Sequence, residues 1–458
     1  MFVSRQDHNS HQAYHGPNLP ANLLSVKPIP IRPQAAAAPR PAPILKAPWR
    51  AAWLLVAPHR LGFFAAALML AVSALWWCAV LLARALGATP EWTVPIAAAH
   101  GLLMSQGFLP LFMAGFLFTA GPKWLGLGEF AARRLLIPVA LMLLGWTLAI
   151  AGFHLHAGLA AAGVALVAGG WSAICVMFVR MFRRSQESDR LHAGVVATAL
   201  CTGALALSLA AAALAAGSEP LLRSANQLAI WGFAAMVFAT VSHRMIPFFT
   251  ASALPLLDAW RPMWLLWLLV ALLYVELLPA LAEPWWWPLP VELRWLQAGV
   301  EVPAALLLLW LALRWGLVQS LKIRLLAMLH GGFVWLGLAF ALSAVSHLLM
   351  ALSGNALSLG LAPLHALTMG YLGATLIAMA TRVSSGHGGR PLAADNTAWT
   401  LYWMLQTAVL LRVLGAIWPA ASAGLTLTAI LVWTAAVTAW ALRYGGWYGR
   451  PRIDGRPG

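Results

Sequence analysis

Charged residues are scarce in this sequence. Only 9% of its 458 residues are Asp, Glu, Lys or Arg, whereas 62% are apolar. A soluble domain has about 25% charged and about 45–50% apolar residues, so these few charges could not cover a water-soluble surface. The apolar residues form long Leu- and Ala-rich runs without alternation, which excludes a β-barrel. A helix needs about 20 such residues to cross a bilayer. The sequence therefore predicts an all-α, polytopic membrane protein.

Cysteines are also rare. The three present, Cys78, Cys175 and Cys201, stand alone inside apolar runs with no pair spacing. This pattern excludes a disulfide framework and a thiolate metal site. We interpret all three as small core residues.

Acidic residues are nearly absent at membrane depth, where Glu276 and Glu301 are the only two. Both lie toward the predicted outer half of the membrane. A polar side chain at this depth is costly and is a functional hypothesis by default. Two carboxylates are few for a proton-coupled transporter, which normally has several along its path.

Twelve apolar segments are present, an even number that places both ends of the chain on one side of the membrane. They are approximately 61–83, 95–120, 135–152, 157–180, 193–216, 226–250, 262–281, 296–314, 326–351, 361–382, 397–418 and 423–443.

The net charge of +16 follows the positive-inside rule and does not require a nucleic-acid partner. Of the 29 Lys and Arg residues, 25 fall on the side of the two termini and only Arg84, Arg223, Arg294 and Arg412 on the other. Because cytoplasmic loops are enriched in Lys and Arg, both termini are predicted to be cytoplasmic. The 25 tryptophans are typical of interfacial aromatic belts.

The first 50 residues contain Pro, Ala, Asn and His without an apolar period. We expect a disordered cytoplasmic tail without a signal peptide, then a membrane domain over 51–445 and a basic cytoplasmic tail over 446–458. His8, His11 and His15 in the first tail are interpreted as solvated residues, with loose metal binding as the alternative.

Three histidines share one depth near the predicted outer face. His100 and His365 follow the outer ends of segments 2 and 10 by four or five residues, and His347 precedes the outer end of segment 9 by about four. At about 1.5 Å rise per residue, all three lie at one level. One interpretation is hydrogen bonding at the interface; the other is haem ligation, for which neutral imidazole is a standard axial ligand. The geometry favours a bis-histidine haem between His100 and His365, with His347 as the substitute.

A second set of histidines lies toward the cytoplasm: His243, His330 and His387. We expect them to form one polar cluster with Arg382 and Arg390, and copper is the favoured occupant because imidazoles suit copper and no thiolate is near. Arg244, Arg382 and Arg390 are predicted to bind anionic groups such as haem propionates, or else to anchor the helices. The remaining membrane-associated histidines are interpreted as interfacial: His59, His154, His156 and His192.

Three stretches carry a family resemblance: "HGLLMSQGFLPLFMAGFLFTAGPKWLG" (100–126), "SHRMIPFFT" (242–250) and "LHALTMGYLGATLIAMATRVSSGHGGRPL" (364–392). They resemble the signature segments of the NnrS family. The matching positions are His100, Arg244, Met245, Pro247, His365, Arg382, His387 and Arg390. The resemblance implies twelve helices in a bacterial inner membrane, association with haem b and copper, and a role in relief of nitric oxide stress, with nitric oxide or iron-nitrosyl species as ligands.

The chain departs from the family pattern in segment 2. The family commonly has His-x-His-Glu-Met, whereas this chain has His100, Gly101, Leu102, Leu103 and Met104. One histidine and the glutamate are replaced, which argues against any role that needs two ligands or an acid on this helix.

Two other functions compete with a haem and copper protein. Twelve helices with internal termini are the ordinary architecture of a transporter or permease. A haem-copper oxidase or nitric oxide reductase also has twelve helices, but segment 10 has no His-x-His and segment 7 no His-His pair. No complete catalytic motif is present, so the sequence does not decide whether the protein is an enzyme.

Overall fold

The structure is a computed structural model that describes residues 47–88 and 90–455. Within these ranges it is helical, with no strand. Most of the predicted N-terminal tail, including His8, His11 and His15, lies outside the described residues, as do the last three residues of the basic tail. The last segment, predicted to end near residue 443, continues as a helix to Tyr448.

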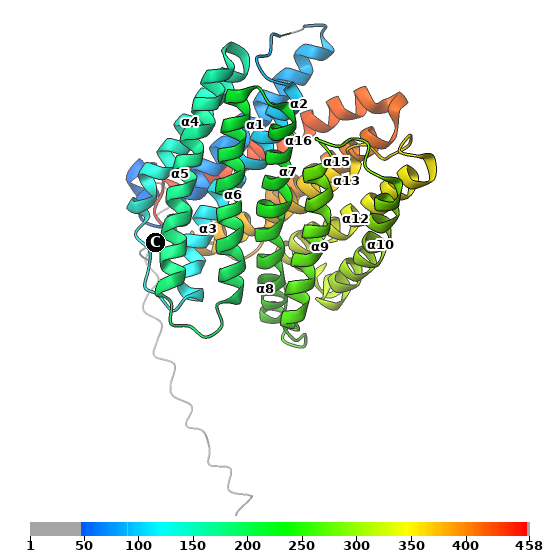
Figure 1. Cartoon of the computed structure of the whole chain (residues 1–458). Helices are drawn as coiled ribbons and strands as arrows, with labels where there is room; N and C mark the ends of the chain where they lie inside the picture. Colours follow the sequence, from blue (N-terminus) through cyan, green and yellow to red (C-terminus); the bar gives the residue numbers. More distant parts are fainter. Residues whose placement is uncertain (1–46, 89, 456–458) are drawn as a thin grey trace, which may run out of the picture. The chain divides into compact units, whose positions relative to one another are not determined.

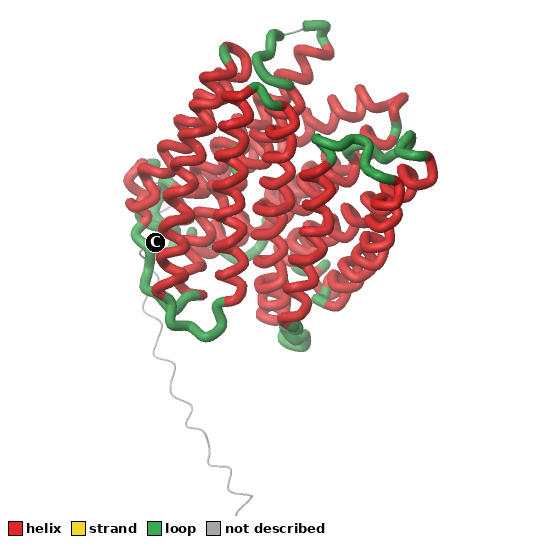
Figure 2. The backbone as a smooth tube through the Cα atoms, in the orientation of Figure 1, coloured by secondary structure: helices red, strands yellow, loops and turns green. Residues whose placement is uncertain are grey.

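The predicted fold class is confirmed: the described part of the chain has twelve helical spans long and apolar enough to cross a membrane (Figures 1 and 2). The helices are η2 (Ala51–Leu55), α1 (Pro58–Ala85), α2 (Ile96–Gln106), α3 (Leu109–Trp124), η3 (Ala132–Leu135), α4 (Leu136–Leu155), α5 (Ala157–Arg184), α6 (Leu191–Ala216), α7 (Glu219–Gln227), η4 (Leu228–Ala235), α8 (Met236–Ala253), α9 (Met263–Ala282), α10 (Val291–Arg314), α11 (Leu317–Ser320), α12 (Arg324–Ser353), α13 (Ala362–His365), η5 (Ala366–Gly373), α14 (Ala374–His387), α15 (Asn396–Ile417), η6 (Pro419–Ala421) and α16 (Ser422–Tyr448).

Three of the spans are irregular, and they are the three that carry the family signatures. Span 2 is broken between α2 and α3, where Pro110 begins the new helix because proline fits the first turn. Span 6 contains the π-helix η4, and span 10 contains the π-helix η5, which begins directly after His365. Local π-helices occur frequently at functional sites, so the irregular backbone marks these spans for attention.

Four spans form the centre of the bundle. In spans 2, 6, 9 and 10, 83%, 78%, 72% and 72% of the residues in the most apolar window are buried, against 39–50% in the other eight. Gly332 allows α12 to approach α14 closely, because an added Cβ would lie 2.9 Å from the backbone nitrogen of Thr375. All the predicted histidine ligands are therefore on the central helices.

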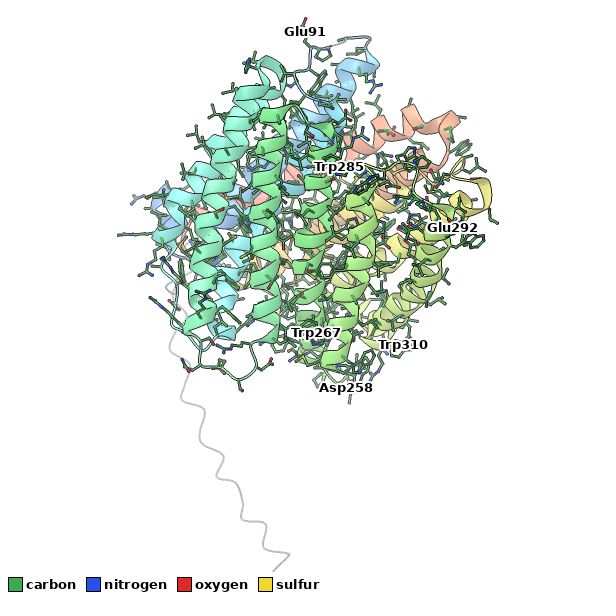
Figure 3. All side chains as sticks on the ribbon, in the orientation of Figure 1. Glu91, Asp258, Trp267, Trp285, Glu292 and Trp310 are labelled. Carbon is green, nitrogen blue, oxygen red and sulfur yellow. The ribbon has the colours of Figure 1, made fainter. Side chains whose placement is uncertain are left out.

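The two ends of the described chain lie at one face of the bundle. The Arg50 amide donates to the Gly449 carbonyl (2.8 Å), and the Arg60 guanidinium donates to the Arg450 carbonyl (2.7 Å). We call this the terminal face and the opposite one the distal face. Figure 3 shows Glu91, Trp285 and Glu292 toward the distal face and Asp258, Trp267 and Trp310 toward the terminal face. Which face is cytoplasmic stays a prediction.

The cysteines are all free, but they do not share one environment. Cys175 is buried and its thiol donates to the Leu200 carbonyl, whereas Cys201 is exposed on the bundle surface. The prediction of a core residue is confirmed for Cys175 and is wrong for Cys201, because the apolar run around Cys201 faces outward as well as inward.

Candidate functional site

His100 and His365 both lie near the distal face. They come from α2 and α13, and each lies within electrostatic range of the same cation, Arg412 of α15. His100 is also within electrostatic range of His365 itself. The His100 ring stacks on Trp77 of α1, with ring centroids 4.0 Å apart and an interplanar angle of 25°. Sequence reasoning did not assign Trp77 and Arg412 to this site, because both are distant from the two histidines along the chain.

Hydrogen bonding fixes which ring nitrogens are available in this pair. The Nδ1 atom of His365 lies 2.9 Å from the Leu361 carbonyl, and because a carbonyl only accepts, this nitrogen is the donor. A neutral His365 therefore keeps its lone pair on Nε2. The Nδ1 atom of His100 is buried without a hydrogen-bond partner in the described part of the chain. Both rings thus hold a nitrogen available to a metal, and the backbone contact of His365 is the kind that orients ligating histidines.

The glycines beside these histidines serve close packing of the protein itself. A Cβ on Gly101 would meet the Asn226 amide at 2.9 Å, and a Cβ on Gly370 would meet the Trp335 ring at 2.6 Å. Both directions are therefore filled by protein side chains, so these two glycines serve the packing of helices and side chains.

The His347 ring faces α10. Its Nδ1 atom is 2.8 Å and 2.9 Å from the two carboxylate oxygens of Glu301 on α10. Glu276 of α9 lies beside this pair. His347 is therefore committed to a carboxylate, and the distal site consists of His100 and His365 without it.

On the terminal face, His243 is paired with His192. The Nε2 atom of His192 lies 2.9 Å from Nδ1 of His243, and Nε2 of His243 lies 3.2 Å from the Pro262 carbonyl. Since that carbonyl accepts, the direction of the whole chain of bonds is fixed: His192 donates to His243, which donates to Pro262. The Nδ1 atom of His192 then carries a lone pair, and it is buried without a partner among the described residues.

His387 is paired with a second histidine that the sequence interpretation placed at the interface. The rings of His387 and His59 have centroids 4.4 Å apart, and His59 is only 2% exposed. Three cations lie in electrostatic range of the pair, Lys123, Arg60 and Arg452, and Arg452 is itself paired with Asp454. The guanidinium of Arg390 lies over the Trp447 ring, 3.8 Å from its centroid.

The other predicted terminal-face residues have separate partners. His330 contacts the Thr250 hydroxyl at 3.0 Å. The guanidinium of Arg244 lies over the Trp124 ring and that of Arg382 over the Phe249 ring. These contacts fit the anchoring alternative for both arginines, since cation–π contacts stabilise a guanidinium at a partly buried position.

The structure therefore does not bring His243, His330 and His387 into one cluster. No hydrogen bond or ring contact joins them, and residues 47–88 and 90–455 contain no group of three or more His, Cys, Asp or Glu that could hold a metal. Sequence reasoning missed His59 and His192, which are both buried. Their position in the first turns of α1 and α6, at the same end of the bundle as His387 and His243, could have identified them as partners.

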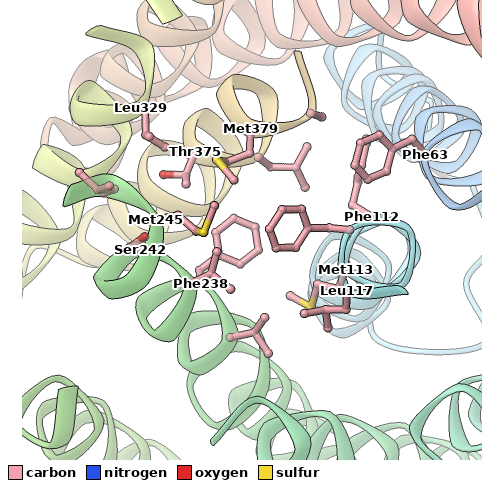
Figure 4. A pocket seen from close by; sticks show the side chains of 16 residues that line it. Phe63, Phe112, Met113, Leu117, Phe238, Ser242, Met245, Leu329, Thr375 and Met379 are labelled. Carbon is pink, nitrogen blue, oxygen red and sulfur yellow. The ribbon is translucent and has the colours of Figure 1, made fainter. Parts of the chain in front are cut away.

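An apolar cavity of about 60 Å³ lies between the central helices. Figure 4 shows its lining, which includes Phe112, Phe238 and the thioethers of Met113, Met245 and Met379. Apolar cavities exclude water and admit small uncharged molecules. This cavity therefore suits an apolar gas and not an ion.

Fold and site together define a multi-pass helical membrane protein in which histidines of the central helices lie near both faces. The NnrS family profile, described as NnrS protein, matches residues 53–452, which is nearly the whole chain. The chain belongs to the NnrS family. No curated protein matches it in sequence.

Proposed function

We propose that this protein binds a b-type haem between His100 and His365 and acts in the response of a bacterial cell to nitric oxide, in the cytoplasmic membrane. The observation that carries the proposal is that these two imidazoles, on two central helices, lie within electrostatic range of each other and of Arg412. Family membership supports the same assignment.

The residues present suit this group. Two neutral imidazoles are a common axial ligand set for haem, and they bring no net charge into the bilayer. Arg412 is the cation that would pair with a propionate. Trp77 stacks on His100 and holds its ring plane. A bound haem would supply an iron that exchanges electrons or binds nitric oxide, and the apolar cavity suits that uncharged gas.

Copper is proposed at the terminal face, with the His192–His243 pair as the ligand source in place of one cluster. The surroundings separate the two pairs. Three cations lie in electrostatic range of His59 and His387, which disfavours Cu²⁺ there, whereas the Asp189 carboxylate lies in range of His192, whose Nδ1 atom carries an available lone pair. Replacing His192 with Ala should lower the copper content of the purified protein, and replacing His387 should not. Copper unchanged in both variants, and in His330→Ala, would exclude this face.

The test of the function itself is the visible spectrum of the full-length protein purified in detergent. The proposal requires a haem Soret band that shifts on reduction with dithionite and again when nitric oxide is added. A colourless protein, purified from haem-replete cells, would favour the alternative of a transporter or permease. A haem-copper oxidase would instead show two haems and oxygen consumption.

A further inference from the structure

Three titratable side chains from three helices meet inside the membrane region, apart from the histidine pairs. They are Glu276 of α9, Glu301 of α10 and His347 of α12. Glu301 is 0% exposed and Glu276 is 6% exposed. Burying a carboxylate is costly unless it is paired, so the partners of these two groups decide what the cluster can do.

Glu301 is paired with His347. The Nδ1–H of His347 reaches both carboxylate oxygens, at 2.8 Å and 2.9 Å. The side chain of Glu276 lies within hydrogen-bonding reach of Glu301. Yet Oε1 of Glu276 is buried and has no hydrogen-bond partner in the described part of the chain. Two carboxylates that face each other are acceptors only, so a donor between them is missing.

No nearby cation fills this role. The other charged groups in range of the cluster are Arg294 and Glu283. Arg294 is only 1% exposed and bonds Glu283, Gln297 and Asn355. Even if His347 is protonated, the two cations are Arg294 and His347. The carboxylates are those of Glu276, Glu301 and Glu283, so one negative charge stays unmatched, at Glu276.

The missing positive charge is that of a proton, not of a metal ion. Ca²⁺ takes six to eight oxygen ligands, whereas this site offers two carboxylates, one of them already bonded to His347. A proton needs only the two facing oxygens. A carboxylic acid hydrogen-bonded to a carboxylate satisfies both groups and removes the excess charge.

We propose that Glu276 and Glu301 share one bound proton inside the membrane, and that His347 exchanges this proton with the distal face. His347 suits the exchange because its side chain is 16% exposed and imidazole takes up and releases protons near neutral pH. The proposal is independent of haem and copper, since none of the three residues belongs to the histidine pairs.

Infrared spectroscopy of the full-length protein tests the proposal directly. A buried carboxylic acid gives a C=O stretching band above the amide bands, and the band shifts to lower frequency in D₂O. We expect this band at neutral pH in the wild type and its loss in Glu276→Gln and in Glu301→Gln. The control is Glu292→Gln, an exposed carboxylate at the start of α10, which should keep the band.

The role of His347 has its own readout. In His347→Gln the carboxylic acid band should persist, but its shift on transfer to D₂O should be several-fold slower than in the wild type. Absence of the band in the wild type, or its survival in both Glu276→Gln and Glu301→Gln, would overturn the shared proton. Unchanged exchange in His347→Gln would overturn the role of His347.

Discussion

The Nε2 atom of His192 lies 2.9 Å from the Nδ1 atom of His243, and this bond joins α6 to the central helix α8. Because His243 is itself fixed by the Pro262 carbonyl, removing His192 leaves a buried acceptor without its donor. His192→Ala should therefore lower the free energy of unfolding by about 1–3 kcal/mol, measured by thermal unfolding in detergent. His192→Gln supplies an amide donor and should recover part of the loss. Equal stability of His192→Ala and the wild type would show that the bond contributes nothing.

Gly163 and Gly169 of α5 offer a matched test of helix packing. A Cβ at Gly163 would lie 2.5 Å from the backbone nitrogen of Ala149 on α4, whereas nothing lies within 4 Å of one at Gly169. Gly163→Ala should force the helices apart at a cost of about 1–3 kcal/mol. Gly169→Ala should be neutral or slightly stabilising, since alanine favours helix. Thermal unfolding of the two variants compares them, and an equal loss in both would contradict the packing role.

The carboxylate of Asp395 should make the stability of the protein fall at acid pH. Its carboxylate caps α15 by accepting from the Ala398 amide (2.9 Å) and pairs with Arg443 of α16. The hydrogen bond from Arg443 holds the pKa of this carboxyl below its usual range. A lowered pKa contributes stability that is present above the usual Asp pKa of about 3.9 and is lost as the pH falls through the folded-state value. Asp395→Asn keeps a capping group but removes the charge. It should therefore be less stable than the wild type at neutral pH and equal to it in acid. A difference that persists in acid would mean that the charge is not the cause.

The predicted orientation of the protein in the membrane rests on the bond between Arg50 and Gly449 and on the distribution of basic residues. Because both ends of the described chain lie at the terminal face, where 25 of the 29 Lys and Arg residues are expected, that face should be cytoplasmic. Alkaline phosphatase fused after Gly458 should be inactive, and fused after Trp286, in a distal loop, it should be active. The reverse pattern of activity would show that the terminal face is not cytoplasmic and would contradict the predicted orientation.

Much of this fold was predictable from the sequence, because each span is a continuous apolar run whose depth follows from helical rise. Depth alone does not give the direction in which a side chain points. Helical rise predicts one depth for His347 and His100, but the His347 ring is turned toward Glu301 of α10. For the same reason, the sequence does not predict that His243 contacts His192 or that His387 contacts His59. Those pairings depend on which helices are neighbours, and one sequence does not encode that in a periodic pattern.

The central claim is that His100 and His365 hold one haem near the distal face. The decisive measurement is the haem content per polypeptide, with the reduced visible spectrum, of His100→Ala and His365→Ala purified in parallel with the wild type. Each replacement should remove most of the haem or convert its spectrum to that of a five-coordinate species. His347→Gln is the control, because the ring of His347 faces Glu301. This variant should keep the wild-type haem content and spectrum. Wild-type haem in both alanine variants would contradict the assignment.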